Sequence, residues 1–291
     1  MLDLSAPEAI LFVVVATAHV AGGTIALMQL VRPRGKWQRF LTAAVTAAVL
    51  ADAIFLGVRA AQIRAVPLTG LFESLVALAL VFGVLYLLLR LVVQQVWFGS
   101  VLAWTTLGMV LLAGLVAKPA SKPQAVAATP WAVAHASVMI LAAAAVVFAT
   151  ANSALYLLTS HRLKQKEILR VLGRMPNMET LGRMNRISLG VGFALLTVGV
   201  LTGLGLVSSL GTGVREWLVD GKVLCIMAVW LLLGGILILD RLSLLKEKAR
   251  AYVTIVAFVL VILAVLGVTV AGVTQHKFSA CTGLVAPTEV A

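Results

Sequence analysis

The sequence is short of charged residues, and of acidic residues above all. Of its 291 residues only 12% are charged, with 11 aspartates and glutamates against 23 lysines and arginines. A water-soluble domain usually has about a quarter of its residues charged. This chain is instead 62% hydrophobic, with a mean hydropathy of +1.08. The composition therefore excludes a water-soluble protein and favours one that lies within a lipid bilayer.

The chain also lacks the motifs of several enzyme classes. It contains no HExxH, no GxSxG and no P-loop sequence. The sequence therefore lacks the motifs on which zinc proteases, serine hydrolases and nucleotide-driven pumps depend. The two cysteines, Cys225 and Cys281, are too few and too far apart for a disulfide framework or a CxxC redox pair. We interpret both as small apolar filler.

Eight apolar windows are long enough to cross a membrane. A hydrocarbon core about 30 Å thick needs about 20 helical residues, each rising 1.5 Å. The windows are 9–31, 40–62, 70–93, 97–117, 131–159, 187–209, 223–240 and 251–272. The N-terminus lacks the basic region and cleavage site of a secretory signal, so the first window is expected to remain as a helix. We predict an all-α, polytopic helix bundle of about eight transmembrane helices, forming a single domain over residues 1–291.

The connections between the windows differ in charge. Those after the first, third, fifth and seventh windows hold 16 of the 23 lysines and arginines, and the other 7 lie on the opposite side. Because basic loops resist translocation, both termini are predicted on the non-cytoplasmic side of the cell's inner membrane. The longest cytoplasmic connection, at about 160–186, is basic and amphipathic, which is typical of contact with lipid headgroups. The net charge of +12 thus indicates topology and no nucleic-acid partner.

Two ionisable residues fall near the predicted bilayer midplane. His19 and Asp52 each lie about ten residues from the outer end of their window, and an ionisable group at that depth costs at least a few kcal/mol. If the two helices are antiparallel neighbours, the carboxylate can hold the imidazole by a hydrogen bond and fix its tautomer. A buried polar pair that only satisfies itself is an equally good interpretation.

A second group of residues lies near the predicted outer face. His135 is close to the start of the fifth window, and His276 follows the end of the eighth. Two neutral imidazoles at one depth can bind a haem iron from opposite sides, and neighbouring aromatic rings can pack on the porphyrin. Trp217 and Asp220, in an external loop at about 210–222, and Glu73 in the third window complete this group. An ordinary aromatic belt would also explain a tryptophan at this level.

Three stretches resemble the cytochrome c assembly family, the CcsA and HemX-like group of membrane proteins. One is WAVAHASVMILAAAAVVFATANSALYLLTSHRLKQK, which is similar to a family helix that opens with a histidine and ends in Ala-Leu-Tyr-Leu before a basic loop. The others are METLGRMNRISLGVGFALLTVGVLTGLG and PLTGLFESLVALAL, with Glu73 at the matching place. The family signature is a tryptophan-rich external loop with WDP inside it, flanked by two histidines. The stretch REWLVDGKVLCIMAVW keeps Trp217 and Asp220 but has Val219 and Gly221 where the pattern has Trp and Pro.

The resemblance implies a haem-handling membrane protein of cytochrome c biogenesis. It would bind haem b without a covalent bond at the outer face, with His135 and His276 as axial ligands, and present it to an apocytochrome c. Covalent haem on this chain is excluded because it has no CxxCH. The resemblance also implies a second membrane subunit with an external domain. As an extension of this hypothesis, His19, with Asp52 nearby, would belong to a haem entry route through the bilayer. Whether the chain is an enzyme, as a haem lyase component, stays open.

Two alternatives remain at this point. One is a small-solute or proton-coupled transporter, for which His19 and Asp52 would form the binding pair. Such transporters use helices interrupted near the midplane, whereas all 8 prolines here fall in termini or connections. The other is a HemX-like regulator or scaffold without catalytic activity.

Overall fold

The predicted windows all correspond to helices in the computed structural model. The structure describes residues 4–31, 35–64, 66–68, 70–91, 96–116, 129–165, 177–210 and 218–264. The helices are α1 (Ala6–Val31), α2 (Gly35–Ile63), α3 (Leu71–Leu89), α4 (Val96–Val116), α5 (Pro130–Lys164), α7 (Met178–Leu210), α9 (Gly221–Arg241) and α10 (Glu247–Ile262). Seven of them are long and apolar enough to cross a membrane, and α10 is described over 16 residues. No strand occurs within these ranges, so the predicted polytopic membrane helix bundle is confirmed.

Local sequence explains where several helices begin. At the start of α1 the Ser5 backbone N–H donates to Glu8 Oε2 at 2.8 Å, and the Ser5 hydroxyl donates to the same oxygen at 2.7 Å. The first of these bonds is one half of a capping box. Thr129 caps the start of α5, because its hydroxyl accepts a hydrogen bond from the Ala132 N–H. Pro130 occupies the first helical position. A proline there costs little because the first N–H groups of a helix have no partner within it.

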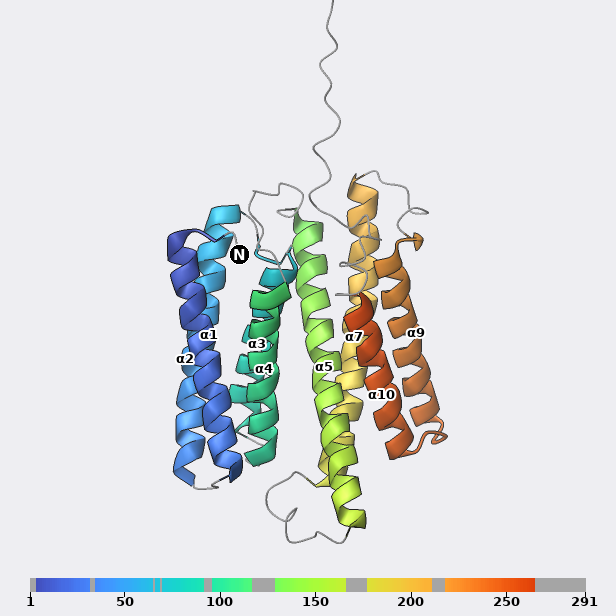
Figure 1. Ribbon diagram of the computed structural model, residues 1–291. Helices are drawn as coiled ribbons and strands as arrows, with labels where there is room; N and C mark the ends of the chain where they lie inside the picture. Colours follow the sequence, from blue (N-terminus) through green and yellow to red (C-terminus); the bar gives the residue numbers. More distant parts are fainter. Residues whose placement is uncertain are drawn as a thin grey trace, which may run out of the picture.

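The helices form two groups of four (Figure 1). We call α1 to α4 the first half, and α5, α7, α9 and α10 the second half. The first half is packed around a trio of rings, Phe12, Phe55 and Phe72, whose centroids lie 5.1 to 5.9 Å apart. Helix α5 also contacts the first half, where Phe148 meets Phe98 edge to face. It therefore joins the two halves.

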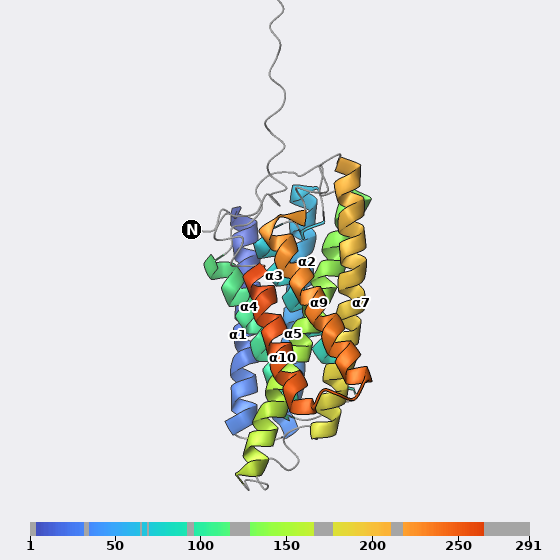
Figure 2. The same cartoon turned by 90° about the vertical axis from the view of Figure 1, so that its right-hand side faces the viewer.

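A separate apolar core holds the second half together. Leu189 of α7, Val229 and Leu233 of α9, and Ala257 of α10 are all fully buried in it. Trp230 stacks on Phe193, with ring centroids 5.5 Å apart, and donates a 2.8 Å hydrogen bond to Thr197. Trp230 therefore packs α9 against α7. Figure 2 shows this side of the bundle, with α9 and α10 crossing over α5.

The two ends of the bundle differ. At one end α1, α3, α5 and α9 begin, and Figure 1 marks the N-terminus there. We call this the outer end, following the charge-based prediction of topology. At the opposite end α5 projects beyond its neighbours, because its 35 residues make a helix about 52 Å long. Its last turn carries His161, Arg162 and Lys164, in agreement with a basic segment outside the hydrocarbon core.

Candidate functional site

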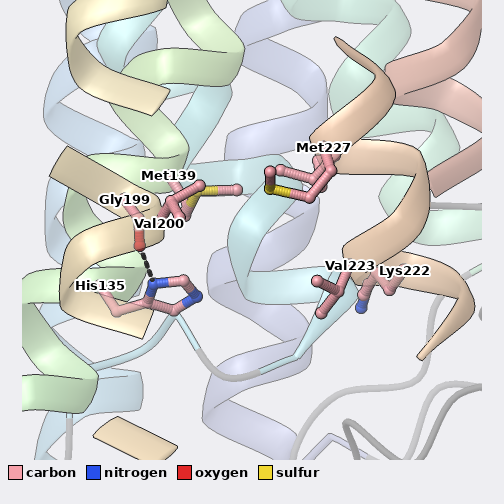
Figure 3. Close-up of a pocket in the computed structure, with 8 residues that line it drawn as sticks. His135, Met139, Gly199, Val200, Lys222, Val223 and Met227 are labelled. Atoms are coloured by element: carbon pink, nitrogen blue, oxygen red, sulfur yellow. Dashed lines mark hydrogen bonds between the residues drawn. The ribbon is translucent and has the colours of Figure 1, made fainter. Parts of the chain in front are cut away.

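A recess lies between α5, α7 and α9 in the second half (Figure 3). The part of its interior that a water-sized molecule can occupy is about 70 Å³, and the space including the open mouth is about 450 Å³. The lining consists of His135, Met139, Gly199, Val200, Lys222, Val223, Ile226 and Met227. Its walls are thus aliphatic and thioether groups, with one imidazole and one amine among them.

The His135 ring is fixed by a hydrogen bond across to α7. Its Nδ1 atom lies 2.9 Å from the carbonyl oxygen of Gly199. A carbonyl only accepts, so Nδ1 carries the proton and Nε2 keeps its lone pair. In Figure 3 the Nε2 atom points away from Gly199 and into the recess. A histidine that binds a metal commonly donates its other ring N–H to a backbone carbonyl in this way.

Glycines on α7 allow α5 to approach closely enough for this bond. A Cβ atom on Gly199 would lie 2.6 Å from Met139 Sδ, and one on Gly205 would lie 2.7 Å from the Trp131 ring. Real Cβ atoms essentially never come so close, so a side chain at either position would force the Met139 thioether or the Trp131 ring to move. The glycine-rich character of the α7 sequence therefore serves to place the His135 and Trp131 side chains against α7.

Asp220 and Lys222 shape the opposite wall. Asp220 is buried and caps α9, its carboxylate accepting a 2.9 Å bond from the Lys222 backbone N–H. It fixes the start of the helix that faces His135. The Lys222 side chain lines the recess and is the one lysine or arginine among the described lining residues. Gly221 occupies the first helical position of α9, where the family's WDP pattern has a proline. Proline is favourable at that position. The helix nevertheless starts there with glycine, so this difference from the pattern leaves the helix start intact.

Two of the sequence-predicted site residues lie outside the described residues. These are Trp217 and His276, and both stay predictions. The structure adds two residues that sequence reasoning missed, Met139 and Met227. Met139 follows His135 by four residues and so shares its helix face. For Met227 the sequence gives no comparable signal, because it belongs to a different helix.

His19 and Asp52 form a buried pair in the first half, away from the recess. The Nε2 atom of His19 lies 3.1 Å from Asp52 Oδ2 and 3.3 Å from Oδ1. The exposed fractions are 4% for His19 and 0% for Asp52. The contact expected from an antiparallel α1 and α2 is therefore confirmed. A small void beside His19 is lined mainly by small residues such as Gly22 and Gly83.

Glu73 also lies in the first half, in an ion cluster near the outer end. Arg59 of α2 donates to Glu8 of α1 and to Glu73 of α3, with both N···O distances 2.5 Å. All three side chains are buried. The described recess lining does not include Glu73, which binds Arg59 in this cluster instead. Together with Arg59 and Glu8, Glu73 links the ends of α1, α2 and α3.

The chemical groups that line the recess suit the ligation of a haem better than that of a bare metal ion. Within the described ranges, no three His, Cys, Asp or Glu side chains gather in a way that could hold a metal ion. A porphyrin brings four nitrogen ligands of its own and needs only axial ligands from the protein. One imidazole with a fixed tautomer, apolar walls and a cation suit such a group.

Comparisons with known proteins point to one family. The family model described as "Cytochrome C assembly protein" matches residues 68–276, from before α3 to beyond α10. A relative is the "Cytochrome c biogenesis protein CcsA" of Guillardia theta. It is 26% identical over 247 residues, covering 77% of this chain and 80% of that protein. The recess lies inside the matched region, whereas His19 and Asp52 precede it.

Proposed function

Because the chain belongs to the cytochrome c assembly protein family and has a role in cytochrome c biogenesis, we propose that it binds haem b at its outer end. It presents this haem for attachment to an apocytochrome c. The observation that carries the proposal is the His135 ring, which donates from Nδ1 to Gly199 and turns Nε2 toward an apolar recess.

Each residue of the recess has a role in this proposal. His135 Nε2 and, by resemblance to the family, His276 would hold the iron. The apolar walls would shield the bound group from water, and the Lys222 amine, which lines the recess, would pair with a propionate. Trp217 would pack on the ring by resemblance to the family, and Asp220 caps the start of α9. Bound haem supplies the vinyl groups that react with the substrate's thiols, while this chain supplies orientation.

Two further partners belong to the proposal. The apocytochrome c brings its own CxxCH thiols to the outer end, and a second membrane subunit with an external domain receives it there. A HemX-like regulator that holds haem without attaching it is the alternative that one observation favours. Val219 stands where the family signature has a tryptophan, and its side chain is exposed rather than part of the recess lining.

Haem binding through the two histidines can be tested by a reduced-minus-oxidised optical spectrum of the detergent-purified protein. We expect a sharp low-spin haem band in the parent chain and its loss in a His135→Ala, His276→Ala double variant. His161→Ala is the matched control, since this exposed histidine lies near the far end of the same helix. Absence of haem from the parent, even after reconstitution, would overturn the proposal and favour the transporter or scaffold interpretations.

We further propose that the His19 and Asp52 pair lies on the route by which haem enters the site. The Asp52 carboxylate makes the imidazole a better iron ligand through its other ring nitrogen. Replacing His19 with glutamine, which keeps a hydrogen bond to Asp52, should lower haem occupancy without lowering expression. Haem content per purified protein measures this. Occupancy equal to that of the parent chain would contradict the entry route while leaving the His135 site intact.

A further inference from the structure

A groove larger than the recess lies where α5 joins the first half of the bundle (Figure 1). Its walls come from α2, α3 and α5 and include Gly57, Ala60, Leu80, Val81, Ile140 and Leu141. The part of it that a water-sized molecule can occupy is about 690 Å³, against about 70 Å³ for the recess beside His135. The groove is therefore large enough for a sizeable occupant.

The groove is apolar and open. Ser137 is the one residue with a polar side chain among its described lining residues. A Cβ atom on Gly57 would meet no atom within 4 Å, so the space beside this glycine is unfilled. An ordered water needs about two to four polar partners, which such walls do not offer. An empty groove would also forfeit dispersion contacts along its walls. An apolar occupant is therefore expected.

The length of the groove matches one leaflet of a bilayer. Pro67, in the connection between α2 and α3, lines it at the outer end, and Val81 lines it deeper in the bundle. Val81 lies ten residues after Leu71, where α3 begins, which is about 15 Å along the helix. The hydrocarbon core is about 30 Å thick, so each leaflet contributes about half of it. A lipid acyl chain has this reach, whereas a transmembrane helix would continue through both leaflets.

A cation lies at the outer end of this groove. Arg64 is exposed and directly follows Ile63, the last residue of α2. It comes four residues after Ala60 and two residues before Val66, and both of these line the groove. A guanidinium pairs with a phosphate through two parallel N–H bonds. An apolar groove with a cation at its outer end thus matches the two parts of a phospholipid.

We propose that a phospholipid of the outer leaflet occupies this groove, with an acyl chain between α2, α3 and α5 and its phosphate paired with Arg64. The lipid fills the outer part of the seam between the first half and α5. Haem does not suit the groove, because no His, Met, Cys or Tyr side chain is among the described lining residues. The proposal is independent of the proposed haem binding, since Ser137 lies about 200° around α5 from His135.

The test measures phospholipid that stays bound to the detergent-purified full chain, by native mass spectrometry. We expect the parent protein to retain a bound phospholipid. Gly57→Leu places a side chain in the open space of the groove and should lose most of this lipid. Gly108→Leu is the matched control, because a Cβ atom on Gly108 of α4 also meets no atom within 4 Å but Gly108 does not line the groove. Arg64→Gln should release the lipid at a lower collision energy.

The contrary results are equally defined. A parent protein without bound phospholipid would overturn the proposal, and equal retention in the two leucine variants would show that lipids only surround the bundle. Gly57→Leu that loses a copurifying membrane protein, but no lipid, would assign the groove to a helix of a partner instead. A lipid held as firmly in Arg64→Gln as in the parent would overturn the pairing with Arg64. Ala60→Leu fills the same groove and gives the same comparison if Gly57→Leu does not fold.

Discussion

Replacing Arg59 with methionine should destabilise the protein by about 3–5 kcal/mol, the usual cost of removing one partner from a buried ion pair. The Arg59 side chain is 3% exposed, and Glu73, one of the two carboxylates that it binds, is 0% exposed. Without the guanidinium, Glu8 and Glu73 would be left in the bundle without the cation that now binds both. The loss should appear in detergent–SDS unfolding curves or as a lower temperature of aggregation.

Two further variants make this prediction specific to the buried charges. The triple variant Glu8→Gln, Arg59→Met, Glu73→Gln removes all three charges, and it should recover most of the lost stability because neutral groups cost less to bury. Arg64→Met is the matched control, because Arg64 is an exposed arginine just beyond the same helix. If Arg59→Met unfolds no earlier than Arg64→Met, the cluster does not hold the helix ends together.

Replacing Arg250 with methionine should cost about 3 kcal/mol, near the lower end of the range for a broken buried ion pair. Arg250 is 2% exposed and lies at the end of the bundle opposite the recess. It donates to Asp240, to Glu247, to Asn185 Oδ1 at 3.2 Å and to the Gly182 carbonyl at 3.4 Å. The expected loss of stability is moderate because Asp240 would still bind Arg186 and because the Glu247 side chain is partly exposed to solvent.

Arg186 provides an internal control for this second cluster. Its Nε lies 2.7 Å from Asp240 Oδ2, but its side chain is 54% exposed. An exposed ion pair contributes about 0–1 kcal/mol, so Arg186→Met should be nearly neutral in the same unfolding assay. Equal losses in the Arg186 and Arg250 variants would show that burial does not set the strength of this network.

The Arg250 cluster also bears on the candidate site. Asp240 is near the end of α9, and the recess residues Lys222 and Met227 are near its beginning. By joining α9 to α7 and α10, Arg250 fixes the far end of the helix that forms one recess wall. The outer cluster around Arg59 has a comparable role for α1, α2 and α3 in the first half.

Much of the fold was predictable from the sequence because its signals are local. The length and hydropathy of each apolar run predicted the helices. Inside a membrane there is no water to bind the backbone, so such a run forms its backbone hydrogen bonds within itself as a helix. The pairing of His19 with Asp52 was also predictable, because consecutive helices with a short connection are antiparallel neighbours and both residues lie at one depth. His135 lies near the start of α5, as its position in the fifth window predicted.

The sequence by itself determined which segments are helices, the position of each ionisable residue along its helix and the family to which the chain is similar. Only the tertiary structure decided which side chains meet across helices. In the structure Glu73 binds Arg59 and does not line the described recess. His135 Nδ1 donates to the Gly199 carbonyl, and Met227 lines the same recess as His135. The reason is physical: such contacts depend on the rotation and packing of helices distant in sequence. Hydropathy, which fixes only depth along the membrane normal, carries no information about that rotation.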